Sequence, residues 1–157
     1  MVELWTDGSG TTLGNPIGFA FVLVHPSSNS RREVAGCLPD GTNNRAELLA
    51  VITGLETISP GSIVFIYCDS EYVCKPFTEG WIKGWERRRW HKVKNDDLWR
   101  RLLTAVGRHR HVQFEWVKGH AKIELNERCD KLAGEARKSQ TPYDSGRITC
   151  DSATAAA

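Results

Sequence analysis

Four acidic side chains are placed where a fold could bring them to one spot. They are Asp7, Glu47, Asp69 and Asp130. Asp7 follows the strand-like segment Val2–Thr6, and Asp69 follows Ser62–Cys68, which is almost continuously apolar. In sheets flanked by helices, sites form beyond the carboxyl ends of the strands. If these two segments are adjacent and parallel, their aspartates emerge side by side.

Carboxylates that are brought together repel one another and lose hydration, and divalent cations relieve both costs. Hard oxygen ligands select Mg²⁺ or Mn²⁺. Two such ions about 3.5–4 Å apart can hold the attacking and leaving oxygens of a phosphodiester. The acidic set therefore predicts metal-assisted phosphodiester chemistry, on the condition that the four side chains converge.

Each acid also has an ordinary structural interpretation. Asp7-Gly8 is a strong hairpin signal, and Asn44 with Glu47 three residues later fits a capping box at a helix start. Asp69 could cap the helix that follows it, and Asp130 could be a surface residue beside an apolar stripe. Taken singly, these interpretations match or exceed the chemical one, so only the joint pattern favours a site.

Composition indicates a single soluble domain. The chain has 157 residues, of which 40% are hydrophobic and 25% charged, and this length suits one domain with its own core. The longest apolar run, Ile17–Val24, is too short for a membrane span. The N-terminus does not resemble a signal peptide. We therefore expect a cytoplasmic protein without a membrane partner.

The cysteines also favour a cytoplasmic protein. Their number is five, and no CxxC pair occurs. We therefore expect neither a disulfide framework nor a zinc site, and we expect the thiols to be reduced. Cys68 and Cys129 fall in apolar patterns and are predicted to be small core residues.

Periodicity predicts elements in the order β-β-β-α-β-α-α-α-β-α. The expected strands are Val2–Thr6, Ile17–Val24, Arg31–Leu38, Ser62–Cys68 and Val112–Val117. The expected helices are one that stops at Pro60-Gly61, two short ones from Glu71 and around Trp81–Trp90, and two longer ones at Asn95–Arg108 and Leu125–Lys138. A three-stranded meander followed by alternating helices and strands predicts an α/β fold: a mixed five-stranded sheet with helices on both faces.

One segment, which we call the basic stretch, concentrates positive charge. Residues 83–101 hold eight Lys or Arg against three Asp or Glu, with Trp85, Trp90 and Trp99 among them. Such a patch is typical of a surface that binds a polyanion. The alternative is a solvated helix face whose Trp rings turn inward.

Six strings carry a resemblance to a known family. They are TDGS with GNP (residues 6–9 and 14–16), TNNRAEL (42–48), CDSEYV (68–73), KNDDLW (94–99), WVKGH (116–120) and NERCDKLA (126–133). In this order and spacing, the chain closely resembles bacterial ribonuclease H type 1 from Val2 to about Lys138. The resemblance implies a ribonuclease H-like fold, a catalytic domain at 1–138, and a polar tail at 139–157 that we expect to be partly disordered.

The resemblance also implies an activity, which is cleavage of the RNA strand of RNA–DNA hybrids to leave 5′-phosphate and 3′-hydroxyl ends. The family's metal ligands fall on Asp7, Glu47, Asp69 and Asp130, and would hold two Mg²⁺ ions with substrate bound, Mn²⁺ being a possible substitute. Its mobile histidine falls on His120, for proton transfer or product release. The hybrid is the implied partner; no protein partner is implied, and a monomer is expected.

Substrate contacts carry over by position. The resemblance places them on Asn15, Thr42, Asn43, Asn44, Glu71, Trp81, Lys83, Trp85, Arg87, Arg88, Arg89, Lys92, Lys94 and Asn95. Thr42 and Asn95 match a pocket for a DNA phosphate. Glu71 stands where the family usually has Gln, and its charge would repel phosphate. The alternatives are a catalytically inactive module of the same fold that only binds nucleic acid, and another nuclease or integrase of this architecture.

Overall fold

The computed structural model describes residues 1–140 and 149–150, so most of the predicted tail, 139–157, lies outside the described residues. The strands are β1 (Val2–Ser9), β2 (Ile17–His25), β3 (Ser30–Leu38), β4 (Ile63–Cys68), β5 (His111–Trp116) and β6 (Thr149–Cys150). The helices are α1 (Asn43–Thr57), α2 (Glu71–Thr78), α3 (Ile82–Arg87), α4 (Asp96–Gly107) and α5 (Glu124–Ser139). The predicted element order is confirmed up to α5.

The sheet has the order β5-β4-β1-β2-β3-β6. β1 runs antiparallel to β2 and parallel to β4, and β4 runs parallel to β5. This confirms the mixed five-stranded sheet that the sequence predicted. β6 adds a two-residue pairing at the β3 edge, which is too short to leave a periodic signal. In the β1–β4 ladder Thr6 pairs with Cys68, so the residues that follow both strands lie next to each other.

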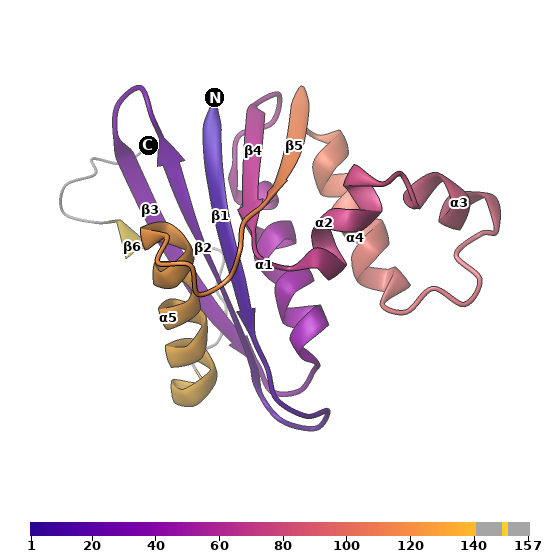
Figure 1. Ribbon diagram of the computed structural model, residues 1–157, viewed down its shortest axis with the longest axis horizontal. Helices are drawn as coiled ribbons and strands as arrows, with labels where there is room; N and C mark the ends of the chain where they lie inside the picture. Colours follow the sequence, from indigo (N-terminus) through magenta and orange to yellow (C-terminus); the bar gives the residue numbers. More distant parts are fainter. Residues whose placement is uncertain (141–148, 151–157) are drawn as a thin grey trace.

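Helices cover both faces of the sheet, as predicted. Successive strand residues point to opposite faces, and at the end of β1 the two faces have different neighbours. Gly8 abuts the backbone of α1, whereas the hydroxyl of Ser9 accepts a hydrogen bond from Arg137 of α5. Figure 1 accordingly shows α5 in front of the sheet and α1 behind it.

The core lies between the sheet and α1. Ten consecutive residues of this helix, from Ala46 to Leu55, are buried, because β1 and β2 cover one side of α1 and α4 packs against another. Large buried side chains from the strands, including Leu4, Phe19 and Phe21, fill the layer. Cys68 and Cys129 are fully buried, which confirms their predicted place in the core.

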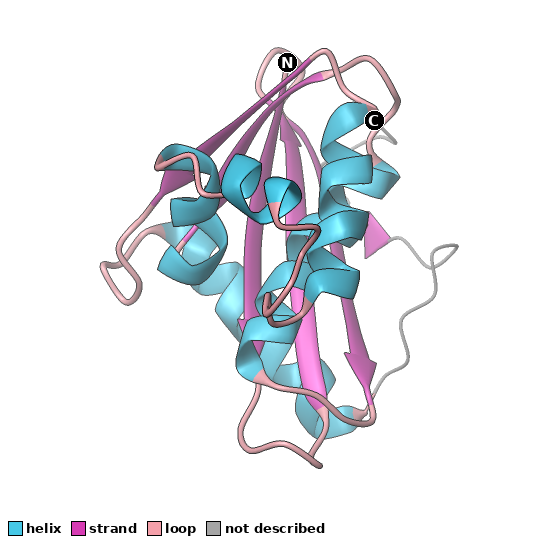
Figure 2. Cartoon of the chain, turned by 90° about the vertical axis from the view of Figure 1, so that its right-hand side faces the viewer, coloured by secondary structure: helices cyan, strands magenta, loops and turns pink. Residues whose placement is uncertain are grey.

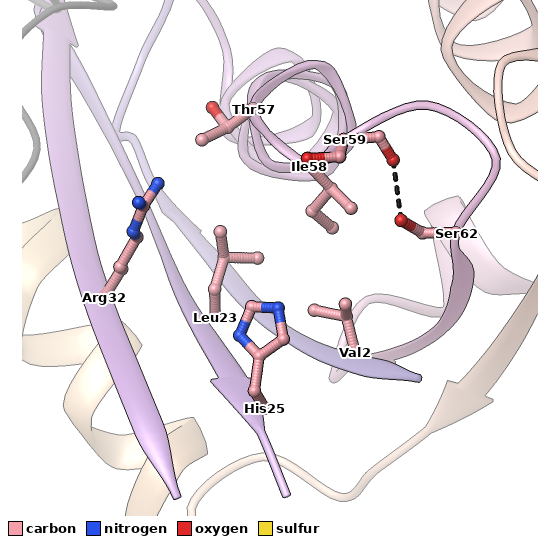
Figure 3. Close-up of a pocket in the computed structure, with 8 residues that line it drawn as sticks. All are labelled: Val2, Leu23, His25, Arg32, Thr57, Ile58, Ser59 and Ser62. Atoms are coloured by element: carbon pink, nitrogen blue, oxygen red, sulfur yellow. Dashed lines mark hydrogen bonds between the residues drawn. The ribbon is translucent and has the colours of Figure 1, made fainter. Parts of the chain in front are cut away.

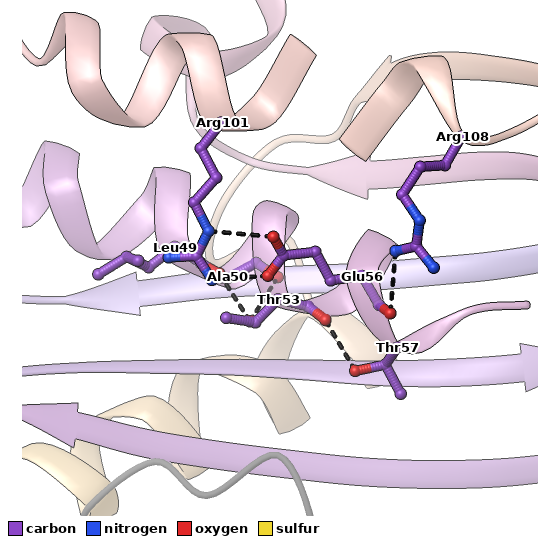
Figure 4. A network of polar contacts seen from close by, with 7 residues as sticks. All are labelled: Leu49, Ala50, Thr53, Glu56, Thr57, Arg101 and Arg108. Atoms are coloured by element: carbon purple, nitrogen blue, oxygen red, sulfur yellow. Dashed lines mark hydrogen bonds and ion pairs between the residues drawn. The ribbon is translucent and has the colours of Figure 1, made fainter. Parts of the chain in front are cut away.

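Polar contacts fix α4 against α1 (Figure 4). Arg101 donates to the Glu56 carboxylate through Nε and a terminal nitrogen, at 3.0 and 2.6 Å. Arg108 donates to the Glu56 carbonyl at 3.1 Å. Because the basic stretch ends within α4, these bonds hold the C-terminal end of that stretch relative to α1 and the sheet.

The basic stretch stands away from the sheet. α3 is the outermost element at the right of Figure 1, and in Figure 2, which faces this side, the short helices lie in front of the strands. The helix predicted around Trp81–Trp90 ends at Arg87, since Arg89 and Trp90 have positive φ angles of 54° and 63°. Among the described helices, none combines the length and hydropathy that a membrane span requires.

Both helix caps suggested by the sequence are wrong. Thr42, not Asn44, caps α1, and its hydroxyl accepts from the backbone N–H of Arg45 at 3.3 Å. Ser70, not Asp69, caps α2, and its hydroxyl accepts from Val73 N–H at 3.3 Å. Thr and Ser are about as suitable for capping as Asn and Asp. Which residue became the N-cap therefore depended on where the chain entered each helix. The result leaves the carboxylate of Asp69 available for other contacts.

Candidate active site

Three of the four acids converge. Asp7, Glu47 and Asp69 each offer a carboxylate oxygen, and these oxygens all lie within 4.8 Å of one another. Asp7 does not sit in a hairpin turn: it is part of β1 and pairs with Ala20 of β2. The strand continues to Ser9, so the turn interpretation of Asp7-Gly8 is wrong.

Gly8 explains why a glycine follows Asp7. A Cβ at this position would lie 2.4 Å from the Glu47 nitrogen and 2.6 Å from the Ala46 carbonyl carbon. Both atoms belong to the backbone of α1, which cannot yield cheaply. The missing side chain therefore lets α1 rest directly on β1, and this contact brings Glu47 next to Asp7.

Hydrogen bonds from β5 and the loop after it fix the backbone at Asp69. Its carbonyl oxygen accepts a hydrogen bond from the indole Nε1 of Trp116, the last residue of β5, at 3.0 Å. The carbonyl of the preceding residue, Cys68, accepts from Val117 N–H, also at 3.0 Å. The end of β4 is thus tied to the end of β5, and the Asp69 carboxylate is directed to the other acids.

The three carboxyl groups are in an unfavourable electrostatic environment. Asp7 and Glu47 are only 4% and 5% exposed. Burial, together with the nearby charge of Asp69, raises the pKa of Asp7 to about 8. Burial is also the main reason that the pKa of Glu47 lies well above its ordinary value, and it raises the pKa of Asp69. Within the described residues, the Oε2 atom of Glu47 has no hydrogen-bond partner.

These features fit a divalent cation. A cation would offset both the repulsion and the lost hydration, and carboxylate oxygens are the ligands that hard divalent ions prefer. The unpaired Glu47 Oε2 atom offers such a ligand without breaking an existing hydrogen bond.

Asp130 and His120 lie beside this cluster. Asp130 is exposed on α5 and is not one of the three converging acids, although its charge contributes to the raised pKa values of Asp7 and Asp69. The predicted convergence is therefore complete for three acids, with the fourth at the rim. His120 is exposed in the loop between β5 and α5, with a φ of 57°. Its charge lowers the pKa of Asp69, which places it near the same group.

A second polar cluster joins α1 to the start of α4. Thr42 caps α1, and Arg45, one turn later, donates to Asn95 Oδ1 at 3.1 Å and to both carboxylate oxygens of Asp97. Asn95 also donates to the Tyr72 hydroxyl at 2.9 Å. The sequence pointed to Thr42 and Asn95 but missed Arg45. The only signal was its position in TNNRAEL, because its partners lie about fifty residues away.

The other predicted contact residues occupy three places. Asn15 lies in the β1–β2 loop, Asn43 accepts from Gly10 N–H, and Asn44 is exposed in the first turn of α1. Glu71, at the start of α2, pairs with Lys75 at 3.2 Å. Both side chains of this pair are exposed, so the pair offsets little of the charge of Glu71.

The basic stretch keeps its cations in solvent and turns most of its aromatic rings inward. The exposed cations are Lys83, Arg87, Arg88, Arg89, Lys92 and Lys94. Trp85 is half-buried against Trp99, with ring centroids 5.0 Å apart, whereas Trp81 is 44% exposed. A cavity of about 150 Å³ is lined by Tyr72, Trp85, Arg88, Lys92, Val93, Lys94 and Trp99. The inward-turned rings agree with the interpretation as a solvated face, and binding of a polyanion by the exposed cations stays a prediction.

Another cavity lies at the opposite end of β1 from Asp7 (Figure 3). It measures about 70 Å³ and is lined by Val2, Leu23, His25, Arg32, Thr57, Ile58, Ser59 and Ser62. Burial, with the positive charges of the N-terminus and Arg32, lowers the pKa of His25. This cavity is separate from the acids and shares no residue with them.

Comparison with known proteins agrees with the geometry. The profile of the RNase H family matches residues 1–138. Ribonuclease H of Trichodesmium erythraeum is 40% identical over 92% of this chain and 94% of its own length. Ribonuclease HI of Caulobacter vibrioides is 42% identical over 90% and 95%. Ribonuclease H of Saccharopolyspora erythraea is 45% identical over 88% and 94%.

Solved structures show the same fold. LC9-RNase H1, described as a type 1 RNase H with the type 2 active-site motif, superposes with a TM-score of 0.83 at 30% identity, covering 97% of this chain and 78% of that one. LC11-RNase H1 in complex with an RNA/DNA hybrid gives 0.69 at 22% identity, covering 88% and 98%. The resemblance predicted from the six strings is confirmed, and the chain belongs to the ribonuclease H family.

Proposed function

We propose that this protein is an endonuclease that hydrolyses the RNA strand of RNA–DNA hybrids and leaves 5′-phosphate and 3′-hydroxyl ends. The observation that carries the proposal is the convergence of Asp7, Glu47 and Asp69 within 4.8 Å in a chain of the ribonuclease H family. A structural neighbour crystallised with an RNA/DNA hybrid supports this class of substrate.

The family is generally dependent on divalent metal, and the buried acids suit it. We assign Mg²⁺ as the metal, with Mn²⁺ as a substitute and two ions in the substrate complex. Asp7, Glu47 and Asp69 would hold them, and Asp130 would complete the site from the rim. Bound there, the ions would lower the pKa of an attacking water and neutralise charge on the scissile phosphate.

The protein's own groups set the conditions for this chemistry. Asp7 holds a proton up to about pH 8 when no cation is present, so it must release that proton before it can bind metal. The unpaired Oε2 of Glu47 can take a metal ion or a ribose hydroxyl. His120 at the rim is proposed to protonate the leaving oxygen, a role that histidine side chains commonly have in catalysis, or to aid product release.

The residues around the acids would select the hybrid. A requirement for 2′-hydroxyl groups at the cut distinguishes RNA from DNA, and the exposed Asn15, Asn43 and Asn44 are placed to contact sugars and phosphates. Glu71, paired with Lys75, is proposed to contact a sugar or base of the RNA strand. Thr42 and Asn95, with Arg45 between them, would bind a phosphate of the DNA strand.

The basic stretch would bind the DNA strand further along. Its exposed Lys and Arg side chains suit phosphates, which position the duplex without reading its sequence. Trp81, which is exposed, and Trp85, which is half-buried, would pack near DNA sugars. The second candidate function is a module that binds nucleic acid without cutting it. Such a module would use the same surface, but it gives no reason for three carboxyl groups to lie buried together.

The test is to incubate the full chain with matched RNA–DNA, RNA–RNA and DNA–DNA duplexes, in Mg²⁺ and in EDTA. We expect cleavage of the RNA in the hybrid alone, and only with Mg²⁺. Asp69→Asn should abolish cleavage while hybrid binding largely survives. Intact hybrid RNA in Mg²⁺ would contradict the proposal, and binding without cleavage by the unaltered chain would favour the second candidate.

A further inference from the structure

Gly119 touches the carboxylate of Asp69. A Cβ built on this glycine would lie 2.9 Å from Asp69 Oδ2 and 3.6 Å from Asp69 Cβ and Cγ. A separation of 2.9 Å is shorter than Cβ contacts found in proteins, so an alanine here would force a shift. The glycine at position 8 faces backbone, but Gly119 faces the movable end of one of the three converging acids.

The loop that carries Gly119 is fixed on the side that faces β4. Val117 N–H donates to the Cys68 carbonyl, and the Trp116 indole donates to the Asp69 carbonyl, both at 3.0 Å. These bonds hold the loop to Asp69, whose carboxylate the glycine faces, and to the residue before it. After Gly119 the chain turns through His120, whose φ is 57°. A strain at position 119 is therefore relieved more easily by the Asp69 side chain than by the loop.

Asn126 is a buried amide near the same carboxylate. It is 3% exposed on α5, and its side chain lowers the pKa of Asp69. Within the described residues, the Oδ1 atom of Asn126 has no hydrogen-bond partner. The Asp69 carboxylate thus lies close to both a glycine of the loop and a buried amide of α5.

We propose that Gly119 is a positioning residue for Asp69: the absence of a side chain lets the loop close on the carboxylate and sets its orientation for metal binding. The inference rests on the proposed function, because it acts through a residue assigned to the metal. An alanine would turn the carboxylate away from Glu47 and Asp7 while leaving the fold intact. Loss of a group that orients a metal ligand typically weakens metal affinity by about ten- to a hundredfold.

The experiment measures Mg²⁺ binding by the full chain without substrate, from amide chemical shifts during a titration. Gly119→Ala should raise the Kd for Mg²⁺ by about ten- to a hundredfold. Its thermal unfolding temperature in EDTA should be no lower than that of the unaltered chain, because moving Asp69 away relieves repulsion between the acids. Gly134→Ala is the matched control, because a Cβ on that α5 glycine meets nothing within 4 Å. It should leave the Kd unchanged. An unchanged Kd in Gly119→Ala would overturn the proposal.

A double variant distinguishes positioning from general damage. In Asp69→Asn the ligand is already lost, so adding Gly119→Ala should weaken Mg²⁺ binding no further, and the two effects should be non-additive. Additional weakening of the same size as in the unaltered background would mean that Gly119 acts through the fold. The readout is independent of cleavage: a chain that binds Mg²⁺ as expected but leaves hybrids intact would contradict the proposed function and not this role of Gly119.

Discussion

Asp7→Asn should stabilise the metal-free protein although it removes activity. The folded chain raises the pKa of Asp7 from 3.8 to about 8, so between these values the folded state holds a proton that the unfolded chain has released. Stability then falls as pH rises from about 4 to about 8, because the folded state binds more protons than the unfolded state in that window. Asparagine carries no charge at any of these pH values, and its Oδ1 can still accept from Gly8 N–H, as Asp7 does at 2.9 Å.

The size of the effect follows from the shift. Each pKa unit corresponds to about 1.4 kcal/mol, and pH 7 lies about three units above the ordinary pKa of Asp7 and still below its raised value. The ionisation penalty at pH 7 is therefore about 4 kcal/mol at most. Asparagine adds a buried amide N–H₂ that needs a partner, so we expect a gain of about 2–4 kcal/mol. For a domain of this size that is roughly 5–15 °C in Tm.

The assay is urea unfolding followed by circular dichroism in EDTA, at about pH 5 and about pH 8. The gain of Asp7→Asn over the unaltered chain should be large at the higher pH and small at the lower one. Asp130→Asn is the control: this exposed residue lies outside the converging group, and its charge is the smallest of the causes that raise the pKa of Asp7. Its effect should therefore stay within about 0.5 kcal/mol. A destabilised Asp7→Asn variant, or a gain independent of pH, would refute the reasoning.

Three further variants test the remaining assignments. His120→Ala should lower kcat by roughly ten- to a thousandfold with little change in KM, measured in single-turnover and steady-state assays; full activity would remove His120 from the mechanism. Changing Arg87, Arg88 and Arg89 together to Ala should raise KM and reduce its dependence on salt; an unchanged salt slope would mean that they do not contact phosphate. Arg45→Met should weaken hybrid binding by about ten- to a hundredfold, the loss expected for one hydrogen bond to a charged group. Unchanged affinity in filter binding would show that Arg45 serves only the α1–α4 joint.

The sequence was sufficient to predict the strands that position the site, because these strands are buried and apolar. The near-continuous apolar run before Asp69 predicted a strand, and β4 is that strand, in the interior of the sheet between β1 and β5. An apolar run of this kind is typical of a strand covered on both faces, but the residues of β4 alternate between buried and partly buried, so one face is only partly covered. The pairing of Thr6 with Cys68 then places the two following aspartates together. Glu47 was found through its motif, and its burial follows from the central position of α1.

Other features could not be predicted because they depend on contacts between distant segments. Arg45 meets Asn95 and Asp97 only after α1 and α4 have packed. The position of Asp130 at the rim depends on how α5 lies across the other face of the sheet. Local propensity also gave wrong helix starts, since Thr42 and Asn44 are both acceptable caps and the path of the entering chain decides between them.

The two glycines beside the acids show why local signals were ambiguous at the site. Asp7-Gly8 has the composition of a hairpin turn, and Gly119 falls in a loop, so turn formation would account for both. In the structure, each glycine instead marks a close approach, Gly8 to the α1 backbone and Gly119 to the Asp69 carboxylate. Both contacts crowd carboxyl groups that repel one another and so cost stability in the metal-free chain. A fold selected for stability alone would keep these segments apart, whereas a site that must bind cations requires them together.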